Sequence, residues 1–175
     1  MEDELFLEDK ALKDETQESE LEERAGRETA EDLYRNALQG GVRLLSRREH
    51  SRLELTRKLR QKGHGEELVQ RVIDHLDHDG LQSDERFVES FVYNRIGNGQ
   101  GPVKIRLDLM ERGIGETLAE RALSKPANYW VKRAEGARSK KYGLELPEQG
   151  KSWNQQARFL SQRGYPADLI YQVLG

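Results

Sequence analysis

Clusters of lysine and arginine are the residues of this chain with the clearest chemical potential. Residues 43–62 hold eight bases against two acids. Two more clusters follow, which contain Lys104, Arg106 and Arg112, and then Lys132, Arg133, Arg138, Lys140 and Lys141 with Arg158 and Arg163 nearby. Such clusters can follow the phosphate backbone of a nucleic acid or another acidic surface. Alternatively, they are ordinary solvated faces of charge-rich helices.

The histidines and carboxylates do not indicate a metal or catalytic site. His75 and His78 lie three residues apart among Asp74, Asp77 and Asp79, the most metal-like grouping in the sequence. No HExxH pattern accompanies them and the aspartates share the histidine face poorly, so we expect no metal and no cofactor. No nucleophile elbow, Walker motif or kinase signature is present. The sequence therefore predicts a binding protein rather than an enzyme.

Three aromatic side chains near the basic clusters could stack on nucleobases, namely Tyr93, Tyr129 and Trp130. Aromatic residues at helical spacing lie in a core more often, so Trp130 and Trp153 are predicted to be core residues. Residues 97–101 read GNGQG. They follow an expected helix and not a strand, so we predict a turn there rather than a phosphate-binding loop.

The formal net charge of −3 over 175 residues conceals an uneven distribution. Residues 1–32 contain 14 acids and four bases, which leaves a net charge of +7 on the rest of the chain. No apolar run of about 18 residues is present, the acidic start is unlike a secretory signal, and there is no cysteine. We therefore expect a soluble cytoplasmic protein without membrane contact or disulfides.

Residues 1–28 are predicted to form a disordered acidic arm. They contain too few apolar side chains to offset the entropy lost on ordering. The simpler interpretation is a solvated tail without a binding role. The alternative is an intramolecular polyanion that competes with a nucleic acid for the basic body.

Three segments of the body share one pattern. Counted from Gly63, Gly113 and Gly164, apolar residues fall at +5, +6, +9 and +10 in every case, and leucine falls at −4. The glycines are 50 and 51 residues apart, which indicates a tandem repeat. The downstream spacing is one stripe of an amphipathic helix.

Further helices complete each repeat. A second helix precedes each glycine, and a third is expected at residues 31–46, 84–97 and 127–142. Start signals are the capping-box serines Ser51 and Ser152, Pro102 after Gly101, and Ser83 or Asp84. The sequence thus predicts an all-α fold, an elongated curved array of three tandem three-helix repeats. We place the boundaries at 1–28 for the arm and 29–81, 82–125 and 126–175 for the repeats.

The repeat glycines are predicted to end helices in the left-handed conformation. Each follows a basic residue, which suits the negative end of the helix dipole. Because Gly113 lies in the middle repeat, we expect a valine there to destabilise the fold more than a valine at Gly164, which leads only into the final helix.

Four stretches resemble the RecX family of recombinase regulators. The first is RREHSRLELTRKLRQKG at 47–63, and the second spans 81–114 with Asp84, Phe87, Arg95, Gly99, Gly101, Pro102 and Ile105. The others are KKYG at 140–143 and KSWNQQARFLSQRGYPADLIYQVL at 151–174. The resemblance covers about residues 33–174. Two departures are Val88, where a small residue such as alanine is expected, and the acidic arm, which lies outside the family pattern.

The resemblance implies the same three-repeat fold and a function that periodicity cannot give. That function is binding of the RecA filament on single-stranded DNA and modulation, mostly inhibition, of the recombinase in DNA repair, recombination and the SOS response. The alternative is a free-standing nucleic-acid-binding helical array with no obligatory recombinase partner. Tight association with DNA that requires the recombinase would favour the first function, and association without it would favour the second.

Recurrence of cations on equivalent helices predicts one basic groove along the array. We expect a monomer that uses this groove to contact the filament and single-stranded DNA, with weaker binding to duplex DNA. The groove residues are predicted to be Arg47, Arg48, Arg52, Arg57, Lys58, Lys62, Lys104, Arg106, Arg112, Lys140 and Lys141.

Overall fold

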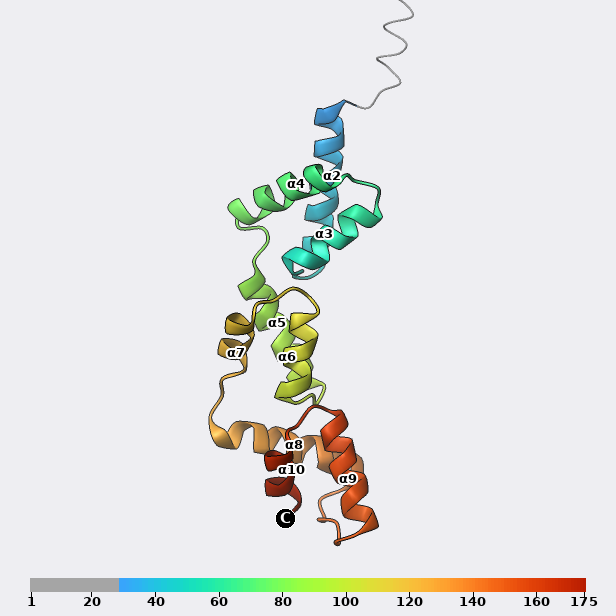
Figure 1. The fold of residues 1–175 in the computed structure, drawn as a ribbon, viewed down its shortest axis with the longest axis vertical. Helices are drawn as coiled ribbons and strands as arrows, with labels where there is room; N and C mark the ends of the chain where they lie inside the picture. The colour runs from blue at the N-terminus through green and yellow to red at the C-terminus, as the bar shows by residue number, and fades with distance from the viewer. Residues whose placement is uncertain (1–28) are drawn as a thin grey trace, which may run out of the picture.

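The computed structural model describes residues 29–175, and the predicted acidic arm at 1–28 lies outside them. The described part contains nine helices and no strand, arranged as an elongated stack (Figure 1). The helices are α2 (Ala30–Leu45), α3 (Arg52–Gln61), α4 (Glu66–His78), α5 (Asp84–Gly97), α6 (Pro102–Met110), α7 (Glu116–Leu123), α8 (Ala127–Tyr142), α9 (Lys151–Gln162) and α10 (Ala167–Leu174). None of these helices is both long and apolar enough to cross a membrane.

The helices pack in three consecutive sets of three. Helices α2, α3 and α4 contact one another and form repeat 1, α5 to α7 form repeat 2, and α8 to α10 form repeat 3. The repeats follow one another along the longest axis of the molecule, from α2 at one end to α9 and α10 at the other (Figure 1). The predicted class, an all-α array of three tandem three-helix repeats, is confirmed.

The repeat glycines end helices as predicted. Gly63, Gly113 and Gly164 have φ of +92°, +79° and +89°, the left-handed region that favours glycine. After each glycine, the next amide donates to the carbonyl of the leucine five residues earlier, at 3.4, 3.1 and 3.1 Å. This is the Schellman arrangement, which satisfies a helix-end carbonyl and turns the chain toward the third helix of the repeat.

Most of the predicted start signals are also confirmed. The hydroxyl of Ser51 accepts from the amide of Glu54, Ser83 caps α5, and Pro102 is the first residue of α6. The capping box at Ser152 is wrong, because α9 begins at Lys151 after Gly150. Gly150 has φ of +111°, a conformation open to glycine, and this lets the helix begin before the serine.

Two separate hydrophobic cores hold the array. Repeat 1 has its own core, formed by Ala37, Leu55, Leu59, Val69, Val72, Ile73 and Leu76. Repeats 2 and 3 share one continuous core that runs from Phe87 to Leu174 and contains the predicted core residue Trp130. Trp153 is only half-buried against that core, and Val88 is fully buried in it. A continuous hydrophobic core therefore ties repeat 3 to repeat 2, whereas the core of repeat 1 is separate from it.

Candidate functional site

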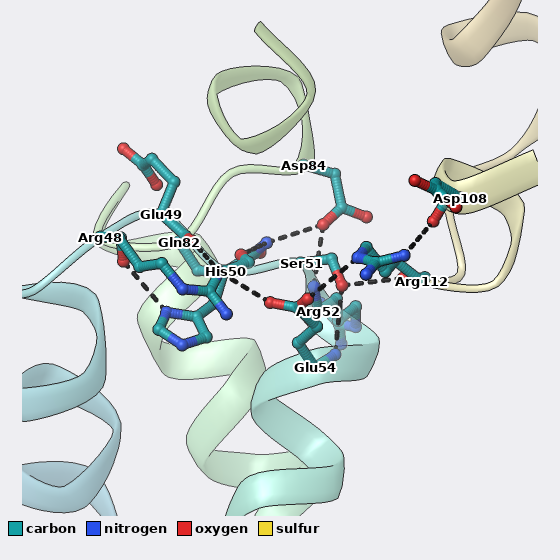
Figure 2. Close-up of polar contacts among 10 residues, drawn as sticks. All are labelled: Arg48, Glu49, His50, Ser51, Arg52, Glu54, Gln82, Asp84, Asp108 and Arg112. Atoms are coloured by element: carbon teal, nitrogen blue, oxygen red, sulfur yellow. Dashed lines mark hydrogen bonds and ion pairs between the residues drawn. The ribbon is translucent and has the colours of Figure 1, made fainter. Parts of the chain in front are cut away.

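The junction between repeats 1 and 2 is built from polar side chains (Figure 2). The hydroxyl of Ser51, at the start of α3, donates to the carbonyl of Arg112 at 2.7 Å. The amide of Arg52 donates to the carboxylate of Asp84 at 2.9 Å, and Gln82 donates to the same oxygen at 2.9 Å. Ser51 and Gln82 are buried, so each bond satisfies a group that has little access to water.

Glu54 holds one arginine from each side of this junction. Its carboxylate contacts Arg112 of repeat 2 at 3.4 Å and Arg48 of repeat 1 at 2.9 Å. The guanidinium of Arg112 also lies over the ring of Phe91, 4.9 Å from its centre. At the edge of the junction, Arg86 pairs with Glu49 at 2.9 Å. The charges of the junction thus largely neutralise one another.

His50 is the buried titratable group of this junction. Its Nδ1 lies 3.0 Å from the carbonyl of Arg48, and its own carbonyl accepts from Gln82. Burial lowers the pKa of His50 below its ordinary value, because the charged imidazolium would lose its hydration. A neutral imidazole that donates to the Arg48 carbonyl is therefore the favoured form.

The junction between repeats 2 and 3 is instead formed by the backbone. The amide of Gly101 donates to the carbonyl of Arg163 at 2.7 Å, and that of Val103 donates to the carbonyl of Gly164 at 3.1 Å. A Cβ at Gly101 would lie 2.5 Å from the carbonyl carbon of Gly164, so glycine permits the close approach. Burial raises the pKa of Tyr165 to about 12, and its neutral hydroxyl donates to the Gly99 carbonyl.

Beside this second junction lies a hollow of about 500 Å³, here called the basic hollow. Five cations line it, four from α8 and one from the end of α9, with no acid among the lining residues. They are Lys132, Arg133, Lys140, Lys141 and Arg163. The ion pairs of residues 29–175 use other cations, so none of these five is in an ion pair with a carboxylate of that part of the chain.

Phe159 and the end of α5 position two of these cations. Lys141 and Arg163 lie over the Phe159 ring, 4.3 and 5.1 Å from its centre. Arg163 also donates to the carbonyl of Asn98 at 2.6 Å, so its guanidinium is fixed at the rim. A concave site with several cations outside ion pairs concentrates the positive potential and suits a chain of phosphates or carboxylates.

A smaller hollow of about 320 Å³ adjoins the polar junction. It is lined by Arg48, Arg95 and Arg112 together with Glu49 and Glu54. Asn98 lines both hollows, so the two meet at the end of α5. In this smaller hollow internal carboxylates already hold Arg48 and Arg112, which makes the basic hollow the stronger anion site.

The residues predicted for a single groove do not gather in one place. Lys140 and Lys141 lie in the basic hollow, and Arg48 and Arg112 lie in the smaller one. The guanidinium of Arg52 instead pairs with the carboxylates of α4. The other six lie outside both hollows: Arg47, Arg57, Lys58, Lys62, Lys104 and Arg106. Of these, Arg57 donates to the Glu111 carbonyl, and Lys104 packs against Gly164.

The partners of Arg52 belong to the cluster that had looked most metal-like in the sequence. Hydrogen bonds from Gln70 and Arg52 lower the pKa of Asp74. Within residues 29–175, no group of three or more histidine or acidic residues is arranged to hold a metal ion. His75 contacts Asp79 at 3.1 Å and the hydroxyl of Tyr34 at 2.6 Å, so its two nitrogens are engaged locally.

The predicted set omitted Lys132, Arg133 and Arg163, although the sequence placed them in its third basic cluster. A usable signal was present in α8. Gly136 separates Lys132 from Lys140, and Ala137 separates Arg133 from Lys141, in steps of four residues. Small residues between cations on one helix face leave room for a hollow. Of the aromatic candidates, Trp130 is buried and Tyr129 half-buried, and only Tyr93 is widely exposed.

Comparison with known proteins identifies the fold and the family. Residues 37–76, 83–123 and 127–174 match the three domains described as RecX, first, second and third three-helix domain. The chain belongs to the RecX family. Regulatory protein RecX of Pseudomonas syringae pv. tomato is 44% identical over 131 residues, which are 75% of this chain and 84% of that protein. Regulatory protein RecX of Pseudomonas putida strain KT2440 is 42% identical over the same shares.

Solved RecX structures share the fold. The crystal structure of RecX from Lactobacillus salivarius has a TM-score of 0.69 and 23% identity, and the match covers 81% of this chain and 94% of that one. Another crystal structure of regulatory protein RecX has a TM-score of 0.70, with 22% identity over 81% of this chain and 71% of that one. The relatives' name supports a regulatory role for this RecX chain.

Proposed function

We propose that this RecX chain binds the RecA filament on single-stranded DNA and modulates the recombinase, mostly as an inhibitor, in DNA repair, recombination and the SOS response. The basic hollow is the observation that carries the proposal, because its five cations have no acidic partner among residues 29–175. Such a site fits a phosphate backbone. We infer the recombinase as partner from the resemblance to RecX regulators.

In this proposal the chain acts by binding and not by catalysis. A regulator that binds one state of a filament more tightly than another shifts the balance between growth and disassembly. A bacterial recombinase works on chromosomal DNA, so we place this activity in the cytoplasm and propose that the chain acts as a monomer. Of the residues predicted from the sequence, Lys140 and Lys141 are the ones that we assign to the phosphate contact.

The test removes two charges from the basic hollow. Lys132→Gln with Lys140→Gln leaves Phe159 and its two stacked cations in place. For a single-stranded oligonucleotide, each lost phosphate contact should lower the salt slope of binding by about 0.7. Fluorescence anisotropy at several salt concentrations measures the slope, with and without RecA assembled on the oligonucleotide.

The matched control removes two exposed lysines elsewhere. Lys125→Gln with Lys151→Gln makes the same change in net charge outside the basic hollow. Equal slopes for the two double variants would contradict the assignment of the hollow. Oligonucleotide binding that is as tight without RecA as with it would favour the alternative, a free-standing nucleic-acid-binding repeat protein.

A further inference from the structure

Helix α6 is apolar on the side that faces solvent as well as on the side that faces the core. Ile105 and Leu109 are completely buried. Val103, Leu107 and Met110 are 39%, 54% and 47% exposed, and their spacing of four and three residues places them on one opposite face. We call these three residues the α6 stripe. A helix with apolar residues on both sides is usually covered on both sides.

The repeat fold does not require this stripe. The stripe lies ten, six and three residues before Gly113, and the same offsets from Gly63 give Leu53, Arg57 and Arg60. From Gly164 they give Asn154, Arg158 and Ser161. Leu53 is used internally, since it contacts Gly113 across the polar junction. Leu53 apart, the equivalent helices therefore fold with arginine, serine or asparagine where α6 exposes valine, leucine or methionine.

The edges of the stripe are basic. Successive helix residues are rotated by about 100°, which places Lys104 on one flank of the stripe and Arg106 on the other. At its C-terminal end Arg57 of α3 reaches the Glu111 carbonyl at 3.4 Å. The nearby acids are the exposed Glu111 and the half-buried Asp108, which is paired with Arg95 at 3.7 Å. An apolar centre between cations is complementary to an apolar protein surface with an acidic rim.

We propose that the α6 stripe is a protein-docking face and that its occupant is a surface of the recombinase protomer with an apolar centre and an acidic rim. This inference rests on the proposed function and divides it between two sites. The basic hollow takes the nucleic-acid backbone, and the α6 stripe takes the protein. Apolar side chains at the centre of such an interface contribute most of the binding free energy, whereas the surrounding charges orient the partners.

The experiment separates protein binding from DNA binding. Leu107→Gln with Met110→Gln alters exposed positions and should leave the fold intact, which circular dichroism checks. Binding is measured by fluorescence anisotropy to a thymidine oligonucleotide alone and to RecA assembled on the same oligonucleotide with a non-hydrolysable nucleotide. We expect filament binding at least tenfold weaker than that of the parent, and oligonucleotide binding within twofold.

The control variant changes two leucines of repeat 3 that are more exposed than Leu107 and Met110. Leu144 and Leu146 are 87% and 62% exposed, and Leu144→Gln with Leu146→Gln should alter neither binding reaction. Filament binding by the stripe variant that equals the parent's overturns the inference and leaves the proposed function standing. A parent chain that binds neither the oligonucleotide nor the filament overturns the proposed function and this inference together.

Two other occupants of the stripe would also overturn the assignment, and each has its own signature. Sedimentation velocity would reveal a second copy, if the parent self-associates and the stripe variant does not. The chain's own arm would be revealed if deletion of residues 1–28 strengthened filament binding of the parent but not of the stripe variant. Unchanged sedimentation and an equal effect of the deletion on both chains support the recombinase as occupant.

Discussion

The two junctions of the array join repeats in the same geometry by different means. In both, the start of the second helix of one repeat meets the glycine turn of the next repeat. Ser51 contacts Arg112 through its side chain, whereas Gly101 contacts Arg163 through its backbone amide. Only the second junction is backed by a continuous hydrophobic core. Side-chain substitutions, pH and salt can weaken a side-chain junction, whereas a backbone junction is sensitive mainly to substitution of the glycines that permit its close approach.

This difference predicts where the molecule bends. Each hydrogen bond of the polar junction contributes about 0.5–1.5 kcal/mol net, and exposed ion pairs contribute less. We therefore expect repeat 1 to move relative to repeats 2 and 3, which move as one body. The predictions that follow test this contrast, from the largest expected effect to the smallest.

The three repeat glycines provide the strongest test, because they differ mainly in what contacts them. Alanine at Gly63 meets open space and should cost only the strain of the left-handed conformation, about 1–2 kcal/mol. At Gly113 its Cβ would lie 2.8 Å from the Leu53 side chain, which can shift, so we expect roughly 2–3 kcal/mol. At Gly164 it would lie 2.5 Å from the Lys104 backbone nitrogen, and we expect roughly 3–5 kcal/mol.

Urea unfolding of the three alanine variants measures this series. From their positions in the repeats, we expected substitution at Gly113 to cost more stability than substitution at Gly164. The contacts of the two glycines now predict the opposite order. Equal losses at all three glycines would mean that the neighbouring repeat does not restrict either turn. A loss at Gly113 larger than that at Gly164 would contradict the greater rigidity of the second junction.

Ser51 should be the most sensitive side chain of the polar junction. Ser51→Ala removes the cap of α3 and leaves the Arg112 carbonyl without its donor, so we expect a loss of about 1–3 kcal/mol. Ser83→Ala is the matched control, because Ser83 caps α5 without a bond across the junction; its loss should be about 1 kcal/mol. Hydrogen exchange should show faster opening of repeat 1 in the first variant only.

Acid should loosen the polar junction through His50. Burial lowers the pKa of His50 in the folded chain, so the unfolded chain, with a pKa of about 6.5, takes up the proton more readily. The stabilising contribution is complete above that pH and is lost as the pH falls below it. Between pH 7.5 and 5.5 the loss is at most about 1.4 kcal/mol.

Urea unfolding of the parent and His50→Gln at both pH values isolates this effect. The variant should lose less stability than the parent, because other titrating groups are common to the two chains. The same pH dependence in both would show that His50 is protonated equally well in the folded and unfolded states.

The ion pair across the junction should have the smallest effect. Glu54 and Arg112 are partly shielded, with side chains 17% and 25% exposed, so we expect a coupling free energy of about 0.5–1 kcal/mol that shrinks at high salt. A double-mutant cycle of Glu54→Gln with Arg112→Gln measures it. The cycle with Arg48→Gln is the control within repeat 1, where the half-exposed Arg48 should couple more weakly.

Local features were predictable from the sequence because each depends on residues close together in the chain. The turn at Gly63 and the cap at Ser51 are of this kind. The start of α9 was predicted wrongly because two residues could precede the helix, Ser152 through its capping box and Gly150 through its conformational freedom. Which of them does so depends on the folded loop before α9. The spacing of apolar residues and the capping residues thus predict which helices form, whereas the residue at which each helix begins or ends also depends on the surrounding structure.

The candidate site was predicted less well, because charge alone does not say what a side chain contacts. Arg52 and Arg112 appeared equivalent in the sequence to Lys140. In the structure Arg52 pairs with α4 acids 22 and 25 residues away, and Arg112 pairs with Glu54. Lys140 faces a hollow formed with Arg163, and no local pattern links these two residues.

The separate core of repeat 1 has a consequence for how the chain leaves the ribosome. Every core side chain of that repeat lies between Ala37 and Leu76, so it can fold while the remainder is still being synthesised. The core that begins at Phe87 is complete only when Leu174 has emerged. At about 5–20 residues per second, the nascent second repeat waits for several seconds with part of its apolar surface uncovered. Aggregation or capture by a chaperone should therefore concentrate in that interval.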